Sequence, residues 1–154
     1  TKNTIIDYIN NLRNKDGCDL LGIFYLKTNQ MFGTLGITNF DANNKRIEYG
    51  LLIGDKKSRE IGMGGLATIL FYDYTFFHTD IIKIHNPVVD GNRNAWKLVE
   101  GLGSKREGTL REHFISSSGE KNNMYLYGLL KKEWILKRET IPKYNIELVE
   151  QKET

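Results

Sequence analysis

The chain contains little cysteine and little proline, and neither residue is abundant enough to indicate a class other than an ordinary globular protein. It contains one cysteine, Cys18, and two prolines among 154 residues. A single cysteine cannot form an internal disulfide, so we expect a reducing, cytoplasmic compartment. An excess of charge of one sign is also lacking, since 22 basic and 19 acidic residues leave a net charge of +3. That excess is too small to indicate a nucleic-acid partner.

Long hydrophobic runs are absent as well. The longest uncharged stretch, Ile61–Tyr72, is shorter than the roughly 20 apolar residues that a membrane-spanning helix needs. No signal-peptide pattern is visible, and we expect no membrane partner. Apolar residues make up 40% of the chain and charged residues 27%, as in a soluble globular protein. The length predicts one domain with a sizeable core.

The hydrophobic pattern predicts helices and strands in mixed order. Apolar residues at helical spacing predict helices over Thr4–Asn14, Ile61–Thr79 and Asn94–Leu102. Runs of β-type residues between polar turns predict strands over Asp19–Lys27, Met31–Thr38, Arg46–Ile53, Ile81–Val89, Arg106–Ser116 and Asn123–Leu130. Hairpin connections make most of the strand pairs antiparallel. The expected fold class is therefore α/β (α+β), a single domain with a mostly antiparallel, mixed central sheet.

The end of the chain differs in composition from the rest. After Trp134 the sequence becomes charged and includes Pro142. We therefore divide the chain into a domain over residues 1–134 and a C-terminal appendage over residues 135–154, with one more strand expected at Tyr144–Val149.

The most informative segment is Tyr49–Gly65, where a strand, a short charged turn and a glycine-rich helix start follow one another. In it, Arg59-x-x-Gly62-x-Gly64 opens the long apolar helix. The first amides of a helix have no partners inside it, and the helix dipole adds partial positive charge, so this is a candidate phosphate seat. The alternative is that the glycines only permit tight packing between helix and sheet.

Two common phosphate motifs do not occur in this segment. The Gly-x-x-x-x-Gly-Lys-Ser/Thr string of a P-loop is absent from the sequence. The glycines do not form the Gly-x-Gly-x-x-Gly dinucleotide fingerprint either, and the strands before them form hairpins rather than a parallel βαβ unit.

Further motifs follow in order along the chain: Asn92-x-x-Ala95, Lys97–Lys105 and Glu107–Glu112. With Arg59–Gly64, they resemble the GNAT superfamily of N-acetyltransferases, and in particular the branch that includes the ribosomal-protein N-terminal acetyltransferases. The resemblance covers roughly Leu20–Trp134. It implies a single GNAT-like domain with helices on both faces of the sheet. It also implies a first strand and helix ahead of the chain's first predicted helix, for which this sequence has no counterpart.

The resemblance implies acetyl-CoA as the co-substrate and gives roles to two segments and one asparagine. The residues that match the cofactor-binding positions are Leu51, Leu52, Ile53, Arg59, Glu60, Ile61, Gly62, Met63, Gly64 and Asn92. The strand backbone would pair with the pantetheine arm, the glycine-rich segment would hold the pyrophosphate, and the asparagine would hold the pantetheine end. The alternatives are ordinary strand core and a turn residue.

The implied reaction is direct transfer of the acetyl group to a primary amine in a ternary complex. By resemblance, Glu48 is the candidate general base, and a backbone amide near Leu52 would polarise the thioester carbonyl. Strand alternation places Glu48 on the face of Gly50 and Leu52. The alternative is a solvated or ion-paired glutamate.

One departure from the family concerns the proton donor to the leaving thiolate. Val99 stands where the family has a tyrosine for this role. Candidate substitutes are His113, Tyr125 and Tyr127. A histidine titrates near neutral pH, which suits His113 to the role, although it is also compatible with a surface histidine.

The acceptor and the partners stay open at this stage. An amino sugar or another small-molecule amine and a peptide N-terminus are the alternatives, and a homodimer is compatible with the resemblance. The segments expected on the acceptor side are asparagine- and serine-rich, which argues against a polyamine: Asn3–Asn14, Thr38–Lys45 and Phe114–Asn123. No metal site is expected, because the histidines lack partners at ligand spacing.

A second function follows from the departures themselves. Val99 and Ser104 replace a tyrosine and a phenylalanine of the family pattern. They are the reason to consider a catalytically silent GNAT-like module that binds acyl-CoA or a partner protein.

Overall fold

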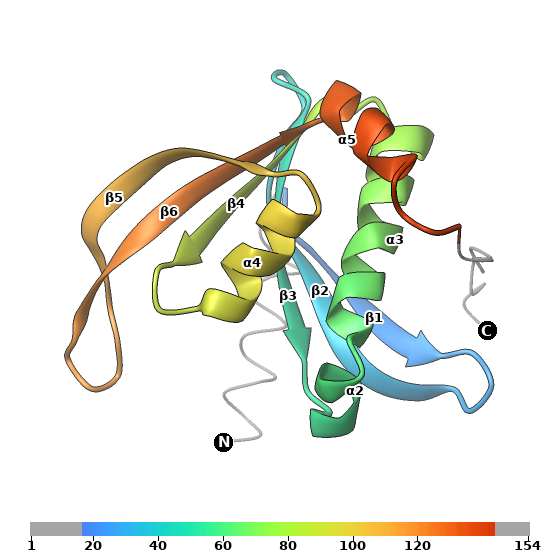
Figure 1. Cartoon of the computed structure of the whole chain (residues 1–154), viewed down its shortest axis with the longest axis horizontal. Helices are drawn as coiled ribbons and strands as arrows, with labels where there is room; N and C mark the ends of the chain where they lie inside the picture. The colour runs from blue at the N-terminus through green and yellow to red at the C-terminus, as the bar shows by residue number, and fades with distance from the viewer. Residues whose placement is uncertain (1–16, 144–154) are drawn as a thin grey trace.

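The structure, a computed structural model, describes residues 17–143 of the chain (Figure 1). In this range, six strands form one sheet in the order β1-β2-β3-β4-β6-β5. The strands are β1 (Asp19–Tyr25), β2 (Gln30–Asp41), β3 (Arg46–Ile53), β4 (Lys83–Val89), β5 (Lys105–Ile115) and β6 (Lys121–Leu130). The helices are α2 (Lys56–Glu60), α3 (Met63–His78), α4 (Arg93–Gly101) and α5 (Lys131–Arg138).

The predicted fold class, a single α+β domain with a mostly antiparallel mixed sheet, is confirmed, and all six predicted strands within this range occur with ends shifted by a few residues. Helices on both faces stay a prediction, because α3, α4 and α5 cover one face of the sheet. The helix predicted at Thr4–Asn14 and the strand predicted at Tyr144–Val149 lie outside the described residues. Four neighbouring strand pairs are antiparallel, and only β3 and β4 run parallel. A parallel pair needs a crossover connection, and α3 is part of it.

The core lies between the sheet and α3. Tyr72 and Phe76 of α3 are fully buried, together with Ile84 of β4 and Trp134 of α5. Tyr49 of β3 donates a hydrogen bond to the Tyr72 hydroxyl at 3.0 Å. The apolar residues of β4 that meet the helices alternate along the strand, so α3, α4 and α5 cover the same face of the sheet. Figure 1 shows these three helices in front of the strands.

The sequence analysis was wrong about the connection between β3 and the long helix. It predicted a charged turn there, whereas the structure has a short helix, α2, and begins α3 at Met63. The cause is Asp55, whose side chain caps α2 by accepting a hydrogen bond from the Ser58 amide at 2.7 Å. Gly62, with φ of +80°, then separates the two helices.

The last helix continues past the boundary drawn at Trp134. In α5, Trp134 donates its indole N–H to the Asp73 carboxylate of α3 at 2.9 Å. Arg138 of the same helix forms an ion pair with Asp73 at 2.9 Å, with both side chains mostly buried. The expected division after residue 134 therefore falls inside a helix that is attached to α3 on both sides of that point, and a separate appendage stays a prediction.

Candidate active site

The main cavity of the described structure opens where β3 and β4 separate. Only three residues of β3 pair with β4, and the last of these pairs is Glu48 with His85. Beyond it the strands diverge, and a cavity of about 890 Å³ lies between them. Its walls are β3 from Tyr49 to Ile53, β4 from Asn86 to Val89, the start of α3 and one side of α4. We call this opening the fork.

Asn86 holds the two strands together at the closed end of the fork. Its side-chain amide donates a hydrogen bond to the Tyr49 carbonyl at 3.1 Å, and it is only 6% exposed. The next residue, Pro87, has no N–H to offer to a neighbouring strand. This suits a position where β4 is no longer paired with β3. Sequence reasoning gave neither residue a role, although an Asn-Pro pair inside an apolar strand was the available signal.

The helix start predicted as a phosphate seat lies at the open end of the fork. Gly62 and Gly64 both line the cavity. The first helical hydrogen bond of α3 runs from the Gly65 amide to the Gly62 carbonyl at 3.0 Å. The amides of Met63 and Gly64 precede it, so they have no helical acceptor. A Cβ at Gly62 would meet no atom within 4 Å, so the positive φ, rather than packing, favours glycine there.

Arg59 lies beside this helix start and lines the cavity. Its Nη1 donates hydrogen bonds to the Ile53 carbonyl at 2.7 Å and the Gly54 carbonyl at 2.9 Å. The guanidinium group therefore stabilises the end of β3 and places a positive charge next to the first amides of α3. Glu60 and Ile61, which were predicted with it, are exposed and do not line the cavity, nor does Met63.

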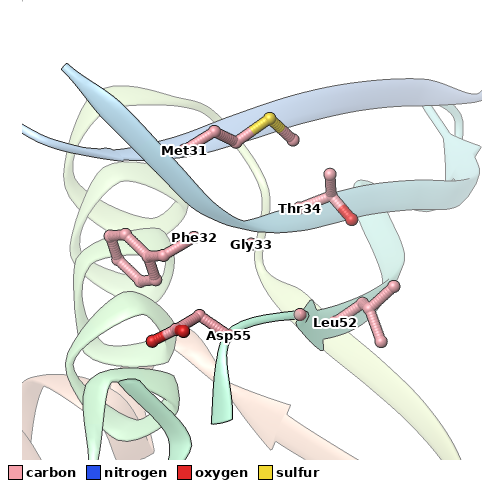
Figure 2. A pocket seen from close by; sticks show the side chains of 7 residues that line it. Met31, Phe32, Gly33, Thr34, Leu52 and Asp55 are labelled. Carbon is pink, nitrogen blue, oxygen red and sulfur yellow. The ribbon is translucent and has the colours of Figure 1, made fainter. Parts of the chain in front are cut away.

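A smaller hollow of about 320 Å³ lies next to the fork, and Leu52 lines both. Figure 2 shows its lining, with the Phe32 ring and the Asp55 carboxylate on one side and Leu52 on the other. Hydrogen bonds from the Ser58 hydroxyl and amide lower the pKa of Asp55, which is therefore committed to capping α2. The remaining lining residues are apolar or uncharged, so this hollow offers no reacting group.

The wall formed by α4 contains Asn92 and Val99. The Asn92 side chain caps α4 by accepting a hydrogen bond from the Ala95 amide at 3.2 Å. Val99 is buried against Val88 and Tyr127. A valine has no proton to donate, so the position that would carry the family tyrosine is chemically inert here.

Glu48 lies at the closed end of the fork, on the sheet face away from α3. The alternating burial of β3 confirms the predicted face, because Ile47, Tyr49 and Ile53 are buried while Gly50 and Leu52 are exposed. The Thr38 hydroxyl donates a hydrogen bond to Glu48 Oε1 at 3.1 Å. Thr38 belongs to an irregular point of β2, where the register with β3 shifts. Sequence reasoning missed this partner, since nothing in the sequence indicates the shift.

The two other predicted catalytic residues do not line the fork. His113 is an exposed residue of β5, beyond a shift in the register of β5 with β6. The Tyr125 ring packs beneath the Arg106 guanidinium, whose carbon lies 3.7 Å from the ring centre. The neighbouring Tyr127 donates its hydroxyl to Glu100 at 2.6 Å, and burial raises its pKa. Glu48 thus lies in the last paired position before the fork without lining its cavity, and neither His113 nor Tyr125 lines the cavity.

None of the helices within residues 17–143 is long and apolar enough to cross a membrane. Nor do the described residues contain a group of three or more His, Cys, Asp or Glu side chains placed to hold a metal ion.

Comparison with known proteins gives one curated relative. No family model matches the chain. A protein described as uncharacterized N-acetyltransferase p20, from Bacillus licheniformis, is 28% identical over 130 residues. The match covers 84% of this chain and 72% of that protein.

Solved structures give the fold. The spermidine/spermine N-acetyltransferase SpeG from Vibrio cholerae, solved with manganese ions, matches with a TM-score of 0.75 at 17% identity. That match covers 88% of this chain and 78% of the other. A chimera of SpeG with hSSAT matches with a TM-score of 0.77 at 17% identity, over 88% of this chain and 83% of that one. The fold is therefore that of the GNAT-type acetyltransferases, while the ribosomal-protein branch stays a prediction.

Proposed function

We propose that this protein is an acetyl-CoA-dependent N-acetyltransferase that moves the acetyl group directly from the thioester to a primary amine in a ternary complex. The fork carries this proposal. A strand without a neighbour offers unpaired N–H and C=O groups to an extended ligand, and the pantetheine arm of acetyl-CoA is one. The same cavity ends at a helix start suited to a diphosphate. The named relative and the fold support an acetyltransferase.

The residues around the fork fit the parts of acetyl-CoA in order. The backbone of Leu51–Ile53 would pair with the pantetheine arm, because this part of β3 has no β4 partner. The segment Arg59–Gly64 would hold the pyrophosphate with the amides at the start of α3 and the Arg59 charge. Asn92 would contact the pantetheine end, since it lines the cavity at the start of α4.

The bound co-substrate would supply an activated acyl group, and the protein would supply alignment and proton removal. Holding an amine against the carbonyl contributes roughly 7–11 kcal/mol through effective molarity. We assign proton removal from the amine to Glu48, and polarisation of the carbonyl to a backbone amide near Leu52. Loss of such a donor costs about 2.7–4 kcal/mol in other enzymes.

Protonation of the leaving thiolate is the step for which none of the predicted proton donors lines the fork. Val99 cannot donate a proton, and His113 and Tyr125 lie outside the cavity lining. We therefore propose that water protonates the thiolate, which is already a good leaving group. His113 and Tyr125 are the protein groups to test against water in this role.

The acceptor we propose is a small-molecule amine. The structural neighbours named as spermidine N-acetyltransferases support that class. The described acceptor-side segments contain only two acidic residues, Asp41, which binds Asn44 and Arg46, and Glu120. This favours an amino sugar over a polyamine, and a peptide N-terminus is the remaining alternative.

The test combines binding and turnover. Excess acetyl-CoA should raise the melting temperature, because ligand at 100 times its Kd adds about 2.7 kcal/mol of stability. The protein is then incubated with acetyl-CoA and separate panels of amino sugars, polyamines and peptides, and acetylated products are identified by mass spectrometry. Free CoA in place of acetyl-CoA is the control. Absence of any stabilisation by acetyl-CoA would contradict the proposal.

A catalytically silent acyl-CoA-binding module is the second candidate. The observation that favours it is the inert wall of the fork at Val99, with Ser104 buried nearby in place of an aromatic residue. Stabilisation by acetyl-CoA without acetylation of any amine would select this candidate. Steady release of free thiol with one amine would exclude it.

A further inference from the structure

We infer that Glu48 and His85 form a proton-accepting pair at the closed end of the fork, in which Glu48 takes the proton from the amine and His85 receives it from Glu48 through solvent water. The inference rests on the proposed function. It starts from the strand register, because Glu48 and His85 are the last residues that β3 and β4 bring side by side before they diverge. The pair therefore lies at the point where the fork begins.

The two side chains share one face of the sheet. Directly paired residues of neighbouring strands point to the same side. On both strands the residues before and after the pair are buried under the helices: Ile47, Tyr49, Ile84 and Asn86. Glu48 and His85 are only partly buried and point to the opposite face. Both are thus open to a ligand that approaches the fork from the side away from α3.

The Glu48 carboxylate is positioned by one neutral hydrogen bond. The Thr38 hydroxyl donates to Oε1 at 3.1 Å, which leaves Oε2 for another partner. No ion pair to Glu48 occurs among residues 17–143. Within this range, Glu48 is therefore held in place by a hydroxyl group and not by a cation.

The second carboxylate near His85 is already neutralised. On the other side of β4, His85 pairs with Gly128 of β6, and a Cβ at that glycine would overlap the carboxylate of Glu107. Glu107 therefore reaches over Gly128 toward β4. Both of its oxygens accept hydrogen bonds from Lys83 Nζ, at 2.8 and 2.7 Å. Glu48 is the neighbouring carboxylate that lacks such a cation.

Among the described residues, the charged groups that face His85 are Glu48 from β3, Lys83 from β4 itself, and Glu107 and Lys105 from β5, while β6 contributes a glycine. Lys105 pairs in register with that glycine and is bound to Glu133 at 2.7 Å. Arg46 of β3 pairs with Lys83 in register but is bound to Asp41 at 3.1 Å. His85 therefore lies between one carboxylate, Glu107, that is neutralised by Lys83 and one, Glu48, that has no ion-pair partner among residues 17–143.

The ammonium form of the acceptor transfers one proton to the Glu48 carboxylate, and the neutral amine then attacks the thioester carbonyl. The C–N bond forms, the C–S bond breaks, and the thiolate leaves with the electron pair and takes a proton from water. The second amine proton also leaves to the pair. His85 accepts protons from Glu48 and releases them to solvent, which restores the carboxylate for the next turnover.

The test uses Glu48→Gln, His85→Gln and the double variant, with His78→Gln at the end of α3 as the matched control. The acceptor is the amine with the highest rate in the panel, and kcat/KM is measured from pH 6 to 10. Glu48→Gln should lower kcat/KM about 10²–10⁴-fold at neutral pH. His85→Gln should lower it less, and its loss should shrink as pH rises, because the amine then arrives already neutral.

The double variant decides whether the two residues act together. If protons pass from one to the other, the double variant should be no slower than Glu48→Gln alone. The proposed pair would be overturned if the double variant lost kcat/KM by the product of the two single losses. It would also be overturned if His85→Gln lowered kcat/KM equally at every pH. Thermal stabilisation by acetyl-CoA should be unchanged in all variants. If the wild type binds acetyl-CoA but acetylates no amine, the proposed function itself fails, which is a separate result.

Discussion

The two ends of β3 and β4 show what a sheet does when its strands pair and when they do not. At the paired end, Ile47 and Ile84 lie side by side and are almost fully buried beneath the helices. At the other end of β3, Leu52 is 67% exposed and lines the cavity. The same two strands therefore build part of the core at one end and a ligand cleft at the other.

The difference is one of backbone bonding as much as of burial. Where the strands pair, the ladder satisfies their N–H and C=O groups. Where they diverge, one side chain, Asn86, bridges to the Tyr49 carbonyl, and the residues beyond have no neighbour on that side. Groups without a protein partner are the ones that a ligand can use. Variants at the two ends, each compared with a control variant, can therefore test the comparison.

The largest difference should appear in stability. Ile47→Ala should cost about 2–5 kcal/mol of the free energy of unfolding, because it leaves a cavity in the core. Leu52→Ala, on the same strand, should change it by less than about 0.5 kcal/mol, since that side chain is exposed. Urea unfolding followed by circular dichroism measures both. Equal losses would contradict the division between the two ends.

For acetyl-CoA binding, a substitution at the open end of the fork should have the larger effect. Gly62→Val forces a β-branched residue into positive φ at the helix start, a strain of about 1–3 kcal/mol. We expect weaker binding of acetyl-CoA by roughly tenfold or more in isothermal titration calorimetry. Gly101→Val is the control, because Gly101 is the last residue of α4, at the end away from Asn92. A Cβ at Gly101 would also meet no atom within 4 Å. Unchanged affinity in Gly62→Val would exclude this loop as the pyrophosphate site.

A third substitution removes the bridge between the two regions. Asn86→Ala leaves the Tyr49 carbonyl without its partner at a buried position, which costs about 1–3 kcal/mol. The free energy of unfolding should fall by that amount, and acetyl-CoA affinity should fall as well if the bridge sets the width of the fork. Asn122→Ala, in the exposed β5–β6 hairpin, is the matched control. A stability loss with unchanged affinity would limit Asn86 to a structural role.

The smallest effect concerns alkaline pH. Burial raises the pKa of Tyr49 well above its ordinary value, since the neutral phenol is favoured inside the core. The stability that this provides is present below about pH 10, where the unfolded tyrosine is also neutral, and is lost as pH rises further. Tyr49→Phe should weaken the fall of unfolding free energy between pH 8 and 11. Tyr74→Phe, on the exposed side of α3, should leave that fall unchanged.

Sequence reasoning predicted the fold and much of the candidate cofactor site, for a physical reason. Strand alternation and helical spacing are local patterns, and they placed six strands and Glu48 on the correct face. Gly62 and Gly64 were expected at the helix start because helix-start chemistry depends on a few consecutive residues, and both line the cavity, while the phosphate seat itself stays a prediction. The capping of α2 by Asp55 was missed, although it is local, because three charged residues in succession resembled a turn.

The set of elements and the residue types at the helix start therefore follow from the sequence alone, since both depend on neighbours in the chain. The tertiary fold sets the pairing of β3 with β4 at three positions and their divergence beyond, because that geometry depends on residues 37 positions apart that are joined through a crossover. It also decided which side chains meet there. Thr38 beside Glu48, Asn86 beneath Tyr49 and Lys83 on Glu107 are contacts that no spacing in the sequence could have indicated.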